Sequence, residues 1–135
     1  MTIAIAELIE RLQDATGPNY ALEIDIFKFL HPEYAEYVQG RGGLIHPCDG
    51  EDVRVQSNVR APNYTASLDA AMALAVKLLD DGFVDIEVAY RSNSGRTIAR
   101  SEICSPRFDA RATSATPAIA LCLAALRAYS EVSGA

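Results

Sequence analysis

The sequence predicts an α+β fold in which a small, mostly antiparallel sheet is layered against helices. The chain has 135 residues, half of them hydrophobic, which suits a single domain over residues 1–135. Apolar residues recur at helical spacing in four segments and alternate with polar ones in three short segments. The predicted order is helix, helix, short helix, strand, helix, strand, strand, helix. A sheet of so few strands needs helices to cover it.

The first two helices are predicted over residues 3–14 and 20–30. The first segment has the i, i+3, i+4, i+7 spacing of an amphipathic helix, formed by Ile5, Leu8, Ile9 and Leu12. Thr2 is its expected cap, and the Gly-Pro pair at positions 17–18 ends it. Asn19 is the expected cap of the second helix.

The next stretch is predicted to be irregular. Residues 32–38 begin with a proline at a first-turn position, which favours a short helical turn. Residues 40–50 open with three glycines in four positions and are predicted to be a loop. Valines that alternate with polar residues predict one short strand over residues 53–60.

A third helix is predicted over residues 67–80, with Thr65 or Ser67 as its cap and Asp69 in its first turn. Its spacing predicts one buried stripe, made of Leu68, Ala71, Met72, Ala75, Leu78 and Leu79.

The second half of the chain predicts a hairpin followed by a buried helix. Residues 83–91 alternate regularly, residues 92–95 suit a turn, and residues 96–104 form the returning strand. Residues 105–115 are predicted to be a loop. Residues 117–130 are apolar on nearly every side and are therefore expected to form the most buried helix.

Charge is distributed unevenly along the chain. The whole sequence carries a net charge of −6, while residues 1–52 alone carry −7 and residues 91–111 carry +3. An acidic chain is a poor candidate for direct nucleic-acid or membrane binding. The longest apolar run has nine residues, about half of a membrane span. Three unpaired cysteines and the lack of a signal-peptide pattern predict a cytoplasmic protein.

Three blocks of sequence point to a known family. They are LIERL with ATGP at residues 8–12 and 15–18, PNYTASLDAA at residues 62–71, and ATPAIALCLAALRA at residues 115–128. In this order they resemble the phage ABA-sandwich domain of small phage and prophage proteins. The resemblance implies an α/β/α sandwich and a phage or prophage origin, and it implies no catalytic residues. Residues 31–58 and the arginine-rich hairpin have no counterpart in it.

No reactive constellation stands out in the sequence. His46, Cys48 and Asp49 lie within four residues and could form a zinc site with His31, Cys104 or Cys122. No paired ligand spacing supports such a site, so neither a metal nor another cofactor is expected. Cys48 has no identifiable base, and Cys122 lies in the most apolar segment. The protein is therefore predicted not to be an enzyme.

The basic residues of the second half allow two interpretations. The set comprises Arg91, Arg96, Arg100, Arg107 and Arg111. These side chains could converge with Ser114 and Thr116 on the start of the last helix and bind a phosphorylated nucleotide. Alternatively, they solvate the hairpin and pair with Asp85, Glu87 and Glu102 across it.

The function predicted first is that of a phage or prophage accessory protein that binds and inhibits a host protein. The host target would be a defence protein that binds nucleic acid, for which an acidic surface offers carboxylates in place of phosphates. The expected acidic face comprises Glu23, Asp25, Glu33, Glu36, Asp49, Glu51 and Asp52. The alternative function is sequestration of a small phosphorylated ligand by the arginine group. A homodimer is also predicted, because a thin sheet with open edges is stabilised by pairing.

Overall fold

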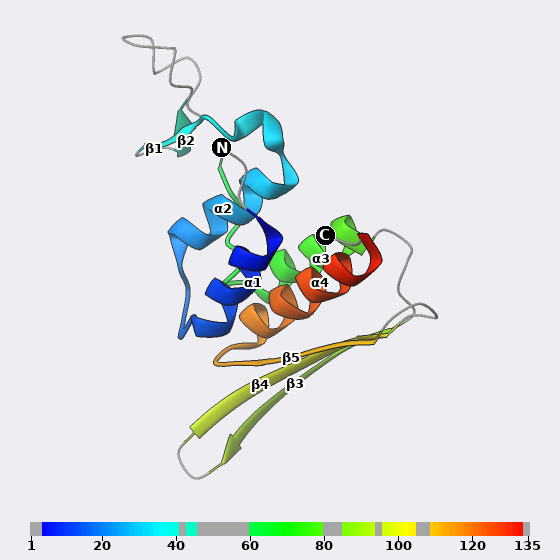
Figure 1. Cartoon of the computed structure of the whole chain (residues 1–135). Helices are drawn as coiled ribbons and strands as arrows, with labels where there is room; N and C mark the ends of the chain where they lie inside the picture. Colours follow the sequence, from blue (N-terminus) through cyan, green and yellow to red (C-terminus); the bar gives the residue numbers. More distant parts are fainter. Residues whose placement is uncertain are drawn as a thin grey trace.

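The computed structural model describes residues 4–40, 43–45, 60–79, 85–93, 96–104 and 109–133. Its elements are α1 (Ile5–Asp14), α2 (Tyr20–Leu30), η1 (Pro32–Tyr34), β1 (Val38–Gly40), β2 (Gly43–Ile45), α3 (Leu68–Leu79), β3 (Asp85–Asn93), β4 (Arg96–Cys104), β5 (Asp109–Ser114) and α4 (Pro117–Ser133). Figure 1 shows α4 between the sheet and the helices α1 and α3. The predicted α+β class, with a small antiparallel sheet packed against helices, is confirmed.

Helix α4 is the centre of the core, as its sequence predicts. Every residue from Ala118 to Leu126 is buried, and so is Ala128. The helix is apolar all round because it packs against the strands on one side and against α1 and α3 on the other. Thr116 caps it, since its Oγ1 accepts a hydrogen bond from the backbone N–H of Ile119 at 3.2 Å.

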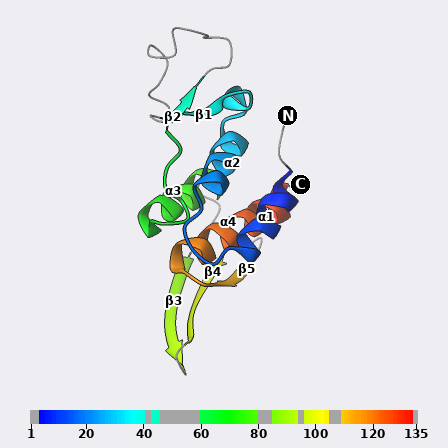
Figure 2. The same cartoon turned by 90° about the vertical axis from the view of Figure 1, so that its left-hand side faces the viewer.

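The sheet has the order β3-β4-β5, with both pairs antiparallel. Alternation along β4 and β5 turns the small and apolar side chains toward α4: Ala99, Ser101, Ile103, Ala110 and Ala112 are all buried. The described helices cover this face, and the other face of β4 and β5 carries exposed or half-buried side chains that are mostly polar, with Ile98 as an exposed apolar one. The β3–β4 hairpin continues beyond the end of β5, and Figures 1 and 2 show its tip extending away from the helices.

Two segments that were expected to be loops are strands. Residues 109–114, expected within a loop over 105–115, form β5. Its buried positions are alanines, which carry a weak hydrophobic signal but fit closely under α4. Residues 38–40 and 43–45 form the ladder β1–β2, with Val38 opposite Ile45, where a loop over 40–50 was expected. The predicted strand over residues 53–60 lies outside the described residues except for Arg60.

The other boundaries agree closely with the sequence. Helix α2 has the predicted bounds, and the side chain of Asn19 accepts a hydrogen bond from the N–H of Leu22. Ser67 caps α3 in the same way, through the N–H of Ala70. Helix α1 begins after Ala4, which makes no side-chain cap bond, and the expected cap Thr2 lies outside the described residues. The predicted hairpin turn is shorter than expected, since β3 extends to Asn93.

The buried stripe predicted for α3 is partly wrong. Leu68 is 42% exposed and Met72 is 37% exposed, although both were expected in the core. The face that packs on α4 is made instead of Ala71, Leu74, Ala75 and Leu79. The helix is apolar around most of its circumference, so periodicity alone did not decide which side is buried.

Candidate functional site

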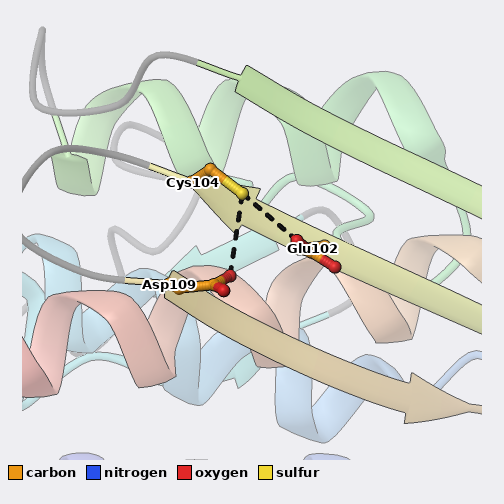
Figure 3. Close-up of side chains that lie close together, drawn as sticks. All are labelled: Glu102, Cys104 and Asp109. Carbon is orange, nitrogen blue, oxygen red and sulfur yellow. Dashed lines mark hydrogen bonds between the residues drawn. The ribbon is translucent and has the colours of Figure 1, made fainter.

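A cluster of polar side chains lies on the outer face of the sheet, at the end where β4 stops and β5 begins. It comprises Glu102, Cys104, Asp109 and Arg111 (Figure 3 draws the first three). Register explains the cluster, because Cys104 is opposite Asp109 and Glu102 is opposite Arg111. Residues two apart in a strand share a face, so all four side chains lie on the side away from α4.

Each carboxylate in this cluster has two different partners. The Cys104 thiol donates to Glu102 Oε1 at 3.2 Å and to Asp109 Oδ1 at 3.6 Å. Arg111 binds the other oxygens, with its Nε 3.1 Å from Glu102 Oε2 and its Nη2 3.5 Å from Asp109 Oδ2. One guanidinium therefore bridges two carboxylates, and both carboxylates face one sulfur.

The carboxylates hold the thiol in its protonated form. The pKa of Cys104 is raised to about 11, first by its hydrogen bond to Glu102 and further by partial burial and the charge of Asp109. A nucleophilic cysteine needs the opposite shift. At neutral pH this thiol is therefore a poor nucleophile.

The same cluster offers one sulfur and two oxygen donors, which lie within 4.8 Å of one another. A structural zinc site takes four such ligands, and the described residues provide no fourth one here. Both carboxylates already pair with Arg111. The arrangement is that of a surface ion-pair ladder. The pairing of Arg111 with Glu102 was one of the two expected arrangements, whereas the place of Cys104 and Asp109 beside it was not predicted, although the Glu-x-Cys spacing on a predicted strand was a usable signal.

Of the arginine group, the structure describes the side chains of Arg100 and Arg111, and both belong to the outer face of the sheet, away from α4. Arg111 points to the outer face of the sheet and pairs with Glu102, as the second interpretation expected. Arg100 is exposed on the same strand as Glu102. Arg91 and Arg96 belong to the hairpin, where Arg91 is opposite Ile98 and Arg96 is opposite Asn93. Arg107 lies outside the described residues.

At the predicted anion site, one backbone N–H at the start of α4 is bound by the protein itself. Thr116 caps the helix with its own hydroxyl. The Ser114 hydroxyl is buried and has no hydrogen-bond partner among the described residues. The Ser101 hydroxyl, two residue pairs away on the inner face of β4, is likewise buried without a partner among the described residues. Neither serine hydroxyl is open to a ligand.

The expected acidic face needs one correction, because Glu23 is only 4% exposed. Its carboxylate turns inward to accept hydrogen bonds from Thr65, so it cannot contact a partner. Asp25 pairs with Arg11, and Glu33 lies 3.8 Å from His31. Glu36 is exposed. The three remaining members, Asp49, Glu51 and Asp52, lie outside the described residues.

The contacts of Glu23 form a buried polar network that ties three parts of the fold together. Glu23 Oε2 accepts from both the N–H (3.1 Å) and the hydroxyl of Thr65, and the Thr65 hydroxyl accepts from the N–H of Asn19 at 2.9 Å. Cys122 on α4 donates its S–H to the carbonyl of Tyr64 at 3.3 Å. Residues 64–65 are thereby fixed to both α2 and α4.

Burial controls the titration of this network. It raises the pKa of Tyr64 to about 12, with a smaller contribution from Cys122. It also raises the pKa of Cys122 far above its ordinary value, and the charge of Glu23 adds to that effect. Like Cys104, Cys122 is therefore a thiol at neutral pH and is not activated.

Two surface features lie on α3. One is an apolar row, defined here as Leu68, Met72 and Val76, which are 42%, 37% and 48% exposed. The other is a groove of about 200 Å³ between α2, α3 and residues 62–64. Figure 2 shows α3 at the outer edge of the helical layer, beside α4. Nothing in the sequence distinguished either feature, because both depend on which side of α3 is buried.

Comparison with known proteins returns no match. No protein-family model matches the chain, and neither a curated protein nor a solved structure matches it. The resemblance to the phage ABA-sandwich domain therefore stays a prediction. Nowhere in the described residues does a helix reach the length and hydropathy that a bilayer crossing requires.

Proposed function

We propose that the protein is a non-catalytic accessory protein of a phage or prophage, which binds and inhibits a host protein in the bacterial cytoplasm. The observation that carries this proposal is the apolar row on α3. Its members are spaced i, i+4, i+8 and therefore form one ridge along the helix. Contiguous apolar side chains left exposed on a soluble protein are typical of a protein–protein contact.

The shape of the row favours a helix-in-groove contact. Helix α3 packs on α4 through its opposite side and lies at the edge of the helical layer, so a partner can reach the row (Figure 2). Three apolar anchors on successive turns are the pattern by which one helix docks into an apolar groove of another protein. The partner surface would therefore be an apolar groove about two helical turns long.

The raised thiol pKa values and the hydrogen bonding of the buried carboxylate favour a binding function over a catalytic one. Both described thiols have raised pKa values, and the buried carboxylate of Glu23 is occupied by Thr65. These groups serve hydrogen bonds that hold the fold. A binding protein needs none of them to be reactive.

Helix α1 supports the predicted attraction to a basic partner. Glu7, Glu10 and Asp14 are exposed on one face of the helix, while its arginine, Arg11, is paired with Asp25. This ridge adds an exposed acidic surface to the exposed Glu33 and Glu36, whereas Glu23 is buried. It would speed association with a basic host protein at low salt. The predicted homodimer, which was motivated by the open edges of a thin sheet, stays a prediction, and β3 and β5 form the edges of the described three-stranded sheet.

The ligand-sequestering alternative has no comparable observation behind it. Arg111 is engaged by Glu102 and Asp109, and the start of α4 is capped by Thr116. We therefore retain host-protein binding as the single proposed function.

The test is capture of a host protein by the purified chain and by variants of the row. Met72→Glu and Val76→Glu place charges on exposed positions, so the fold is expected to survive. Glu10→Gln, on exposed α1, is the matched control. We expect both row variants to lose the captured protein, and the control to retain it with weaker capture at low salt only. Equal capture by the row variants, or no specific capture by the wild type, would overturn the proposal.

A further inference from the structure

The groove between α2 and α3 is separate from the apolar row and has its own chemistry. Its volume of about 200 Å³ is below the roughly 300 Å³ at which sites for drug-sized ligands begin. The lining is mostly apolar, with Leu30, Pro62, Ala73 and Leu74 beside the aromatic rings of Phe27 and Tyr64. A group the size of one aromatic ring or one branched aliphatic chain fits this space.

One wall of the groove is held rigidly by the buried polar network. Pro62 and Tyr64 form this wall, and a backbone hydrogen bond of 2.9 Å from Tyr64 N–H to the carbonyl of Pro62 closes the turn between them. Thr65, the next residue, is fixed to Glu23, and the carbonyl of Tyr64 is fixed to Cys122. A wall held in place before binding loses little conformational freedom when a ligand arrives.

The rim of the groove carries a cation. Lys77 lines the groove from α3 and is exposed, and no hydrogen bond or ion pair is found for it among the described residues. His31 lines the opposite side, where its ring centroid lies 4.6 Å from that of Phe27 and its Nδ1 lies 3.8 Å from Glu33. Because His31 already lies beside Glu33, Lys77 is the cation at the rim that remains, among the described residues, to bind an anion.

We propose that this groove binds a small apolar carboxylate, with its hydrocarbon part between Phe27 and Tyr64 and its carboxylate on the ammonium group of Lys77. The apolar lining accounts for the hydrocarbon part, and Lys77, which has no ion-pair partner among the described residues, accounts for the charge. This site is independent of the host-binding row, and either can fail without the other.

The probes are benzoate and isovalerate, titrated into the isotopically labelled full chain and followed by amide NMR shifts. Ligands of this size bind with a Kd on the order of 1 mM. We expect shifts confined to α2, α3 and residues 60–66. Benzamide, which has the same ring without the charge, is the matched ligand and should bind about tenfold more weakly.

Two variants test the site itself. Lys77→Gln should weaken benzoate binding about tenfold and leave benzamide unchanged, whereas Arg100→Gln, which removes an exposed cation on the sheet, should change neither. Ala73→Leu should fill the groove and abolish both, and Ala6→Leu on exposed α1 is its control. Equal affinity for benzoate and benzamide, an unchanged affinity in Lys77→Gln, or shifts located outside the groove would each overturn the proposal.

Discussion

The two described cysteines lie in opposite surroundings and reach the same protonation state for different reasons. Cys122 is enclosed in α4, where burial disfavours its thiolate. Cys104 lies on the outer face of the sheet, where the hydrogen bond to Glu102 is the largest cause of its raised pKa. Each thiol has a carboxylate nearby, Glu23 in the interior and Glu102 on the surface.

Polar groups have different roles in the interior and on the outer face of the sheet. In the interior, a lost hydrogen bond leaves a partner unpaired without water, so the network of Glu23 and Thr65 is expected to control stability. On the outer face, water can replace any lost partner, so the cluster around Cys104 is expected to control only local chemistry. In both regions the thiols and carboxylates already have protein partners, whereas the apolar row and the groove on α3 are open to a partner molecule.

The largest effect is expected from a charge placed in the core. Leu123 is fully buried in α4, so Leu123→Asp should lower the free energy of unfolding by more than about 4 kcal/mol and unfold the chain. Leu123→Met, which keeps the volume, should cost less than about 1.5 kcal/mol. Circular dichroism during urea denaturation measures both, and a cooperatively folded Leu123→Asp variant would show that α4 is not the core.

A smaller loss is expected from the interior carboxylate. Glu23→Ala leaves the N–H and hydroxyl of Thr65 without their acceptor and should cost about 2 to 4 kcal/mol. Glu33→Ala removes a side chain that is 65% exposed and should change stability by less than about 0.5 kcal/mol. Urea denaturation of the pair tests the contrast between buried and surface carboxylates. Equal costs would contradict it.

The two buried serine hydroxyls that have no hydrogen-bond partner among the described residues predict the opposite effect: removing such a hydroxyl should raise the stability. The Ser101 hydroxyl is buried with no partner in the described structure, so Ser101→Ala should stabilise the protein by about 1 kcal/mol. Ser67→Ala removes the cap of α3 and should destabilise it by about 1 kcal/mol. Thermal unfolding of both variants shows whether each substitution raises or lowers the stability. A destabilised Ser101→Ala variant would mean that its hydroxyl has a hydrogen-bond partner.

The surface cluster should change reactivity without changing stability. Glu102→Gln replaces the carboxylate that faces the Cys104 thiol with a neutral amide, whose oxygen is a weaker acceptor, so the pKa of the thiol should fall from about 11 toward 9. Alkylation by iodoacetamide at pH 8, in a Cys48→Ser background, should then be faster by about tenfold for each unit of the fall. Glu7→Gln, at an exposed position on α1, is the control. An unchanged rate would show that Glu102 does not hold the thiol proton.

Much of the fold was predictable because its signals are local. The periodicity of α1 and the all-round apolar pattern of α4 fixed both helices, and Asn19 and Thr116 marked helix starts. Strand β5 was not predicted from the sequence because alanine contributes little hydrophobic signal, although alanine is the residue that packs closely under α4.

The candidate sites were harder to predict because they depend on long-range packing. The burial of Glu23 follows from its pairing with Thr65, which lies 42 residues away in the chain. The cluster at Cys104 follows from strand register, which is set by the unexpected β5. The apolar row on α3 could not be told from a buried stripe until the side facing α4 was known.

The proposed function depends on contact between the apolar row on α3 and a host protein. A photo-crosslinking residue at Val76, expressed in the bacterial host, tests it most directly, with Ala6 on exposed α1 as the matched control position. We expect one host protein to be crosslinked at position 76. This crosslink should be absent at position 6 and should be lost when Met72→Glu is added. Identical crosslinks from both positions, or no host protein crosslinked at position 76, would contradict it.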